Sequence, residues 1–255
     1  MYETPALNEC IYAHNLRIKS VGDLTPYLNV SCLYLERNRI PNLDGLKQLR
    51  NLKYLNINFN MIENIDLCEG FDFLEELHVV GNSVSSVEFP STKKLSVRVM
   101  KLSRNRLTEL YDFSSLSNLE CLDLSHNFIQ IPEKPEIDFF LQWSSQRLPK
   151  SLKQLYLTPN EFVRTIPRFR QTIIVNCRHL VYLDNAPVTS EEVEIAEAEL
   201  IHGSDAGLAV RRNQIERAEK ERIDQMNRFR LFQQSHTEID VLRSELLTFI
   251  QSTDS

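Results

Sequence analysis

The 255-residue sequence contains only six glycines, and they are scattered along the chain. A loop that cradles a phosphate needs several glycines close together, and we find no such loop, serine-hydrolase elbow, zinc-protease motif or kinase motif. The five cysteines form no closely spaced pair and no cluster with histidine at zinc-binding spacing. We therefore predict no catalytic residue, no metal and no cofactor, and we expect buried or half-buried free thiols in a reducing compartment.

Long apolar runs are also missing. No stretch approaches the roughly 18 consecutive apolar residues of a membrane span. The N-terminal residues MYETPALNEC do not place a basic region before an apolar run, as a secretory signal would. These absences predict a cytoplasmic protein without a membrane partner.

Most of the chain has no excess charge of either sign. Residues 1–185 carry 21 Lys+Arg and 21 Asp+Glu, whereas residues 186–255 carry 8 and 14, so the net charge of −6 lies entirely in the tail. Phosphate binding needs a concentrated basic surface. The charge distribution therefore argues against a nucleic-acid partner and leaves other proteins as the expected partners.

What the sequence does contain is an internal repeat. The pattern Leu33-x-Leu35-x-x-Asn38-x-Ile40 recurs five more times with aliphatic or aromatic substitutions. The asparagines follow one another at spacings of 22, 22, 23, 22 and 33 residues, and they are Asn38, Asn60, Asn82, Asn105, Asn127 and Asn160. Self-similarity at this period predicts an α/β fold, a leucine-rich-repeat solenoid with short parallel strands on its concave face and turns and short helices on its convex face.

Each residue type in the repeat has a mechanical role. The two aliphatic side chains of Leu-x-Leu point to the same side of a short strand and fill the coil. The asparagine stands where the chain leaves the strand, and its amide can bond backbone groups that the turn would otherwise bury unpaired. Neighbouring asparagines are therefore expected to form a ladder.

The repeat divides the chain into four parts. We expect residues 1–29 to form a degenerate N-terminal capping repeat, residues 30–165 to form six repeats with a helical insertion near 136–147, and residues 166–189 to form the C-terminal cap. Residues 190–255 are predicted to be a helical tail, with one long amphipathic helix from about residue 208. Its apolar stripe consists of Met226, Phe229, Ile239, Leu242, Leu246 and Phe249.

Three behaviours of the tail remain open. The long helix could fold back on the solenoid, dock on a partner or pair as a coiled coil, or it could be partly disordered.

The concave face is the expected binding surface. The residue inside each Leu-x-Leu points outward, and neighbouring positions add further polar and aromatic side chains; aromatic residues and arginine are the usual anchors of protein interfaces. Asp123, Ser125, His126 and His78 could be arranged as a catalytic set, but no pocket that excludes water is apparent. The candidate partner-binding residues are Tyr34, Phe59, His78, Lys101, Arg104 and Tyr156.

Segments on both sides of the repeats resemble a known family, the leucine-rich-repeat axonemal dynein assembly factors. The resemblance lies in Tyr2-x-Thr4-Pro5-Ala6-Leu7-Asn8, Ile166-Pro167-x-Phe169-Arg170-x-Thr172, Arg178-His179-Leu180-x-Tyr182-Leu183-Asp184-x-x-Pro187-Val188 and Glu197-Ala198-Glu199. It implies a non-catalytic cytosolic factor that, with chaperones, helps to fold and preassemble dynein heavy chains for cilia or flagella. The alternative is a regulatory or structural subunit of a phosphatase or of the mature axoneme.

Overall fold

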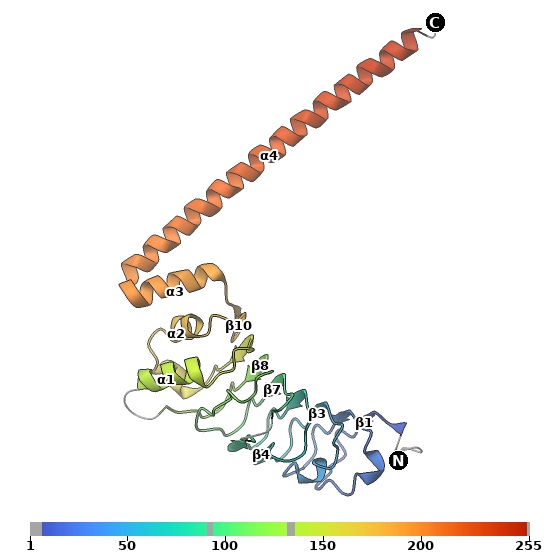
Figure 1. The fold of residues 1–255 in the computed structure, drawn as a ribbon, viewed down its shortest axis with the longest axis vertical. Helices are drawn as coiled ribbons and strands as arrows, with labels where there is room; N and C mark the ends of the chain where they lie inside the picture. The colour runs from blue at the N-terminus through green and yellow to red at the C-terminus, as the bar shows by residue number, and fades with distance from the viewer. Residues whose placement is uncertain (1–6, 91–93, 132–135, 254–255) are drawn as a thin grey trace. The chain divides into compact units, whose positions relative to one another are not determined.

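The computed structural model describes residues 7–90, 94–131 and 136–253, without the side chains of residues 136 and 233–253. The chain divides into two compact units, Met1–Ala196 and Glu197–Ser255. The first unit is a solenoid and the second is helical, so the predicted fold class is confirmed (Figure 1).

A nine-stranded sheet runs along the first unit (Figure 1). Its first eight strands are parallel and follow chain order, and the last strand closes an antiparallel hairpin at the C-terminal end. The strands are β1 Cys10–Tyr12, β2 Cys32–Tyr34, β3 Tyr54–Asn56, β5 Glu76–His78, β7 Val99–Lys101, β8 Cys121–Asp123, β9 Gln154–Tyr156, β10 Tyr182–Leu183 and β11 Ala186–Pro187.

The other side of the coil is less regular. It contains short 3-10 helices, η2 Thr25–Tyr27, η3 Asp44–Leu46 and η4 Glu161–Arg164, and two α-helices, α1 Glu136–Gln146 and α2 Phe169–Asn176, which pack against each other. Two repeats also form a second parallel sheet from β4 Asn64–Asp66 and β6 Ser86–Glu88. The sequence analysis did not predict this sheet, whose central residues Ile65 and Val87 are buried in the core.

The core is continuous from the first strand to the C-terminal cap. In every strand from β2 to β9 the middle residue is almost wholly buried, because the two flanking residues point to the opposite side of the sheet. Within the 33-residue spacing, α1 adds Phe140 and Trp143, and the Phe140 ring lies 5.7 Å from the Phe162 ring and 5.6 Å from the Phe169 ring. One repeat alone could not bury these side chains, so stacking of repeats stabilises the fold.

The asparagines form the expected ladder, in which each side-chain amide bonds to backbone groups and not to the next asparagine side chain. Asn105 donates to the carbonyl oxygens of Val79 (2.8 Å) and Leu102 (2.9 Å), and its side-chain oxygen accepts a hydrogen bond from the Val84 amide (3.0 Å). Two of these three bonds reach the preceding repeat. Asn127 and Asn160 repeat the arrangement. Each asparagine therefore ties two turns of the solenoid together while satisfying buried backbone groups.

Arg170 links several segments at the C-terminal end of the main sheet through hydrogen bonds. Arg170 of α2 forms two hydrogen bonds with the Glu192 carboxylate, at 2.6 and 2.8 Å, and donates to the Leu183 carbonyl (3.1 Å) and the Pro187 carbonyl (2.8 Å). A bidentate arginine–carboxylate pair combines charge with a defined geometry. This cluster fastens the β10–β11 hairpin to α2 and to the start of α3 (Ser190–His202).

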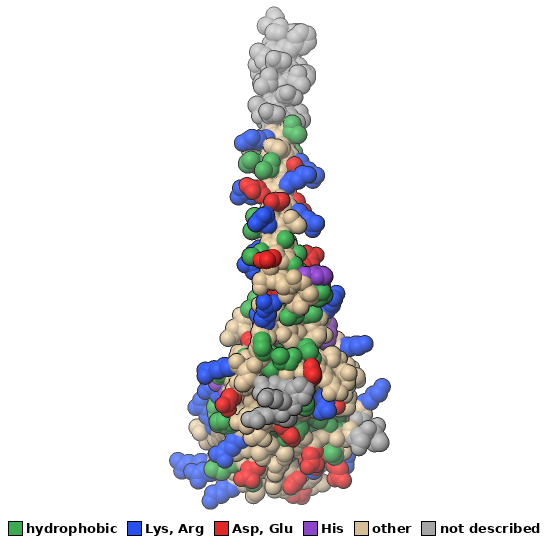
Figure 2. All heavy atoms as spheres, turned by 90° about the vertical axis from the view of Figure 1, so that its left-hand side faces the viewer, with side chains coloured by type: hydrophobic (Ala, Val, Ile, Leu, Met, Phe, Trp, Pro, Cys, Tyr) green, Lys and Arg blue, Asp and Glu red, His purple; other side chains and the backbone are tan. Residues whose placement is uncertain are grey.

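The second unit contains the end of α3 and the 50-residue helix α4, Ser204–Thr253. The long helix begins at Ser204, four residues before the start expected near residue 208. Gly203, with φ of +91°, separates the two helices, whereas Gly207 lies inside α4 against Glu199 of α3. Most of the described apolar side chains of α4, Met226 and Phe229 among them, are exposed, and Val210 is half-buried. Figure 2 shows them interleaved with charged side chains on the face in view. The predicted residues Ile239, Leu242, Leu246 and Phe249 lie outside the described side chains.

Candidate partner-binding surface

The main sheet aligns its outward side chains in columns. The third residues of the strands lie in register from β1 to β9, and the first residues form a second column on the same face. The third-residue column consists of Tyr12, Tyr34, Asn56, His78, Lys101, Asp123 and Tyr156. Four of the six predicted site residues, Tyr34, His78, Lys101 and Tyr156, therefore stand in one line on one face.

Four aromatic rings lie against one another along the N-terminal half of this face; the first pair is stacked and the next two are tilted. The ring centroids of Tyr12 and Tyr34 are 4.8 Å apart, those of Tyr34 and Tyr54 are 4.9 Å apart, and those of Tyr54 and His78 are 5.2 Å apart. Tyr54 was not predicted, because only the third-residue column was considered on these strands. Its position two residues before Asn56 could have identified it, since strand residues two apart share a face.

The surroundings of these rings shift the pKa values of Tyr54 and His78 in opposite directions. Burial raises the pKa of Tyr54, and the neighbouring Tyr34, Glu76 and Glu36 raise it further. Burial also lowers the pKa of His78, as does the nearby Lys101, so the imidazole is neutral at neutral pH. His78 Nε2 lies 3.4 Å from Glu76 Oε2, but among the described residues it has no hydrogen-bond partner.

A second set of exposed side chains comes from the residues just before the ladder asparagines. Arg37, Phe59, Gly81 and Arg104 all have a left-handed backbone, with φ between 55° and 70°. Gly81 leaves room for the Phe59 side chain, because a Cβ at position 81 would lie 2.6 Å from the Phe59 ring. The guanidinium carbon of Arg37 lies 5.8 Å from the centroid of the same ring. The predicted residues Phe59 and Arg104 belong to this column, and Phe59 is 48% exposed.

The C-terminal half of the face is hollowed and charged. Lys101 and Tyr156 line a depression of about 390 Å³, and the charged residues beside them are Glu76, Glu120, Asp123 and Lys153. Glu120 is ion-paired with Arg98 and with Lys153, each at 3.0 Å. The structure thus separates the predicted site residues into an aromatic stack, a left-handed column and a charged hollow.

Asp123 and Ser125, two of the residues that suggested a catalytic set, hydrogen-bond to each other in the turn that follows β8. The Ser125 amide and hydroxyl both donate to Asp123 Oδ1, at 3.0 and 2.6 Å. Within the described residues no hydrogen bond joins His126 or His78 to Ser125, and a general base must lie within hydrogen-bond reach of the proton that it removes. The arrangement stabilises the chain at the end of β8.

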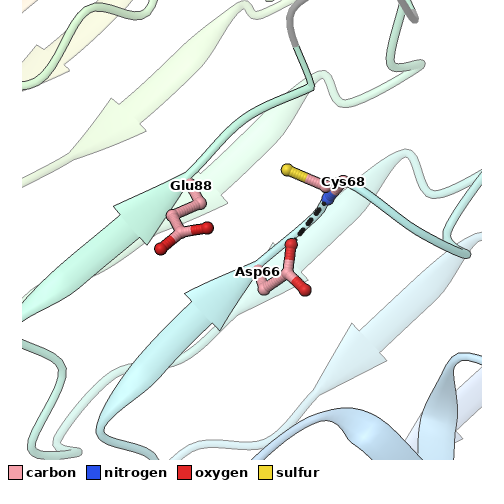
Figure 3. A group of neighbouring side chains, drawn as sticks. All are labelled: Asp66, Cys68 and Glu88. Atoms are coloured by element: carbon pink, nitrogen blue, oxygen red, sulfur yellow. Dashed lines mark hydrogen bonds between the residues drawn. The ribbon is translucent and has the colours of Figure 1, made fainter.

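One group of side chains outside this face could in principle ligate a metal. Asp66 and Glu88 come from the neighbouring strands β4 and β6, and Cys68 follows β4 (Figure 3). Their ligand atoms lie within 4.8 Å of one another. However, Asp66 Oδ2 is 2.6 Å from the Lys47 ammonium, and partial desolvation and the neighbouring Asp66 raise the pKa of the Cys68 thiol. A lysine already neutralises this carboxylate, and a raised thiol pKa disfavours the thiolate that binds metals.

All five cysteines are unpaired. Cys121 and Cys177 are buried and Cys10 and Cys32 are half-buried, but Cys68 is exposed, so the expectation of burial was wrong for this residue. In the described part of the chain, the helices include none with the length and apolar character needed to span a membrane.

The coil of parallel strands, its buried leucines and its asparagine ladder define a leucine-rich-repeat solenoid fold. The model of the Leucine Rich Repeat family matches residues 118–139. The fold is similar to the functional domain of InlJ from Listeria monocytogenes, with a TM-score of 0.48 and 17% identity over 69% of this chain and 35% of that one.

Several curated proteins similar to this chain are named dynein axonemal assembly factor 1. Dynein axonemal assembly factor 1 of Homo sapiens is 36% identical over 102 residues, which are 40% of this chain and 13% of that protein. The Drosophila pseudoobscura pseudoobscura homolog is 32% identical over 105 residues, 40% of this chain and 6% of that protein. Leucine-rich repeat-containing protein ODA7 of Chlamydomonas reinhardtii is 32% identical over 44% of this chain and 24% of its own length. The resemblance predicted from the sequence is confirmed, and this chain spans a quarter or less of these relatives.

Proposed function

We propose that this chain is a non-catalytic scaffold for protein interaction that acts in the cytoplasmic preassembly of axonemal dynein for cilia or flagella. The observation that carries the proposal is the aligned, partly aromatic face of the main sheet in a chain whose curated relatives include proteins named dynein axonemal assembly factor 1. Dynein heavy chains and chaperones are the proposed partners.

The geometry of the face supports a role in binding. Its side chains project from strands whose positions are set by a continuous core, so little conformational freedom is lost when a partner binds. Exposed aromatic rings beside arginine, such as Phe59 beside Arg37, are the residues that anchor protein interfaces. The six proposed contact residues remain Tyr34, Phe59, His78, Lys101, Arg104 and Tyr156.

The test is affinity purification of the tagged full chain from soluble cytoplasm, with quantitative mass spectrometry. We expect dynein heavy chains and chaperones, and we expect Phe59→Ala to reduce their recovery by about tenfold, as the loss of an interface anchor would. Glu88→Gln, on the second sheet, is the matched control and should leave recovery unchanged. Stoichiometric recovery of a phosphatase catalytic subunit or of tubulin-bound complexes would instead favour the regulatory or axonemal alternative.

For the tail we propose pairing of α4 with another helix. Its exposed apolar side chains would be covered in such a pair, and a lone helix in water gains little from propensity alone. Sedimentation equilibrium of the full chain should show a mass that rises with concentration, and Phe229→Glu should reduce this rise whereas Asn213→Glu should not. A mass that stays at the monomer value over the whole concentration range would rule out pairing between copies.

A further inference from the structure

Two rows of mostly exposed side chains flank the asparagine ladder along one edge of the solenoid. The residues just before the ladder asparagines form the first row, and the residues just after them form the second. Backbone hydrogen bonds hold successive turns in register there: the Arg37 amide donates to the Asn58 carbonyl oxygen (2.9 Å), and the Met61 amide donates to the Ile40 carbonyl oxygen (3.0 Å). We define the ladder rim as six exposed residues of these rows: Arg37, Phe59 and Arg104 from the first, and Arg39, Met61 and Arg106 from the second.

The four arginines of the ladder rim have no acidic partner in the described part of the chain. Each of them is exposed, and no ion pair between described residues includes any of them. Other arginines of the same unit are paired: Arg98 lies 3.0 Å from Glu120, and Arg170 lies 2.6 Å from Glu192. Within the described residues, the rim therefore presents positive charge that no carboxylate neutralises by contact.

The carboxylates nearest to the ladder rim in the sequence lie at its margins. Glu36 precedes Arg37, but one of its oxygens already accepts a hydrogen bond and the other is buried. Glu63 is exposed two residues after Met61, and Glu161 lines a hollow of about 480 Å³ beyond the C-terminal end of the rim. Two exposed carboxylates at the margins do not offset four arginines, so the rim has a net positive charge.

The arginines form two pairs that lie three turns apart, Arg37 with Arg39 and Arg104 with Arg106. Phe59 and Met61 come from the turn next to the first pair, and they are 48% and 55% exposed. The following turn contributes Ser83 and Gly81, which leaves room for the Phe59 ring. Exposed apolar side chains therefore lie between two groups of positive charge.

This arrangement fits a short acidic segment with an apolar residue inside it. Neighbouring turns repeat at about the 4.8 Å spacing of strands, so the two arginine pairs lie about 15 Å apart, which is the length of about four or five residues of extended chain. Arginine binds a carboxylate through two parallel hydrogen bonds. An apolar side chain is stabilised when it leaves water to contact Phe59 and Met61.

A nucleic acid fits the ladder rim less well. Without the four rim arginines, residues 1–185 keep 17 Lys+Arg against 21 Asp+Glu, so phosphates that extend past the rim would meet a net negative body. A nucleic-acid footprint is a larger basic surface than this one. Phosphates would also leave the apolar side chain of Met61 without a suitable contact.

We propose that the ladder rim binds an acidic segment of a partner protein, with carboxylates on the two arginine pairs and an apolar side chain between them against Phe59 and Met61. The inference rests on the proposed function, because it takes the partner to be a protein and keeps Phe59 and Arg104 as contact residues. It adds Arg37, Arg39, Met61 and Arg106 to the contact and gives the partner segment a charge.

The test titrates a short fluorescent peptide with the full chain at low salt and follows fluorescence anisotropy. The peptide carries a pair of glutamates on each side of a central leucine, and the matched peptide has glutamine in place of every glutamate. We expect the glutamate peptide to bind at least about tenfold more tightly. Added salt should reduce its affinity. Replacing its leucine by serine should weaken binding by about 3- to 10-fold.

Two double variants of the chain locate the effect. Arg104→Gln combined with Arg106→Gln removes one arginine pair and should weaken binding of the glutamate peptide by about 3- to 30-fold. Arg50→Gln combined with Arg98→Gln removes the same charge outside the rim and should leave binding unchanged. Met61→Ser should make the leucine and serine peptides bind more nearly alike. The substituted side chains are all exposed, and thermal melting checks that each variant is folded.

Several results would overturn the proposal. They are equal binding of the glutamate and glutamine peptides, no binding of the glutamate peptide, or equal weakening by the two double variants. A single-stranded oligonucleotide of the same charge that binds as tightly as the peptide would overturn it too, because the rim would then recognise phosphates. So would self-association that Arg104→Gln with Arg106→Gln abolishes, because acidic residues of a second copy would then be the occupant.

The inference and the proposed function can fail separately. If the glutamate peptide binds as expected but the full chain captures no dynein heavy chain, the proposed function fails while this inference stands. If the chain captures the heavy chain and Arg104→Gln with Arg106→Gln leaves both that capture and peptide binding intact, the inference fails while the proposed function stands.

Discussion

The solenoid and α4 use similar apolar side chains in opposite ways. In the solenoid, an aliphatic residue recurs at nearly constant spacing and is buried by the next turn, as Leu55 and Leu77 are. In α4, Ile215, Met226 and Phe229 are between 48% and 61% exposed. The difference shows that apolar content alone does not define a core. In a repeat protein the adjacent turn covers each core side chain, whereas the apolar side chains of a single helix can be covered only by another helix or another surface.

Removing a buried leucine should have the largest effect on stability. Leu55→Ala deletes a fully buried side chain between two turns of the solenoid, and we expect the free energy of unfolding to fall by about 2–5 kcal/mol. Met226→Ala in α4 should change it by less than about 0.5 kcal/mol. Urea denaturation followed by circular dichroism measures both. A similar loss for the two variants would mean that α4 is packed in solution.

The asparagine ladder should come next. Asn105→Ala would leave the Val79 and Leu102 carbonyls and the Val84 amide without their side-chain partner, and we expect a loss of about 1–3 kcal/mol. Asn213→Ala, at an exposed position of α4, is the control and should have almost no effect. Should Asn105→Ala match wild type in the same denaturation experiment, the ladder would not contribute to stability.

A smaller loss is expected at Gly81. Arg37, Phe59 and Arg104 show that this left-handed position accepts larger residues, so the backbone alone does not require glycine. A methyl group would however meet the Phe59 ring. Gly81→Ala should therefore cost about 1–2 kcal/mol and displace that ring. Gly22→Ala, where a Cβ meets nothing within 4 Å, should be neutral by thermal melting. Equal melting temperatures would show that the ring moves at no cost.

The smallest effect should appear as a dependence on pH. The pKa of His78 is lowered from its ordinary 6.5, first by burial and then by Lys101. His78 therefore binds a proton more readily in the unfolded chain than in the folded chain. The free energy of unfolding should fall as pH drops from 7.5 to 5.5. His179, whose pKa is lowered mainly by burial, should act in the same direction. His78→Asn should flatten part of this slope, and an unchanged slope would mean that His78 titrates normally in the folded state.

The repeat could be predicted because its period carries structural information. Spacings of 22 and 23 residues align the strands, so the column of Tyr34, His78, Lys101 and Tyr156 follows from counting. Tyr54 was missed although its position in the strand was available. The repeat spacing could not predict that the face divides into aromatic rings, a left-handed column and a charged hollow. That division depends on the orientation of the rings and on which charged side chains form ion pairs.

Other features depend on contacts between segments far apart in the chain. Arg170 meets Glu192 and two carbonyl oxygens only after α2 and the β10–β11 hairpin have packed, and the motif that contains this arginine says nothing about its partners. The second sheet likewise forms because Ile65 and Val87 both enter the core from adjacent turns. No short sequence motif predicts either the Arg170 contacts or the second sheet.

The sequence by itself determined the solenoid, its register and the asparagine ladder, because one short pattern repeated at a nearly constant period leaves few ways to bury its leucines. Only the tertiary structure decided that three tyrosine rings and a histidine ring lie against one another, that Glu36 Oε2 is buried without a hydrogen-bond partner among the described residues, and that Phe59 lies against Gly81. The physical reason is that burial follows from periodicity, whereas charge pairing and ring stacking depend on side-chain positions that the fold sets.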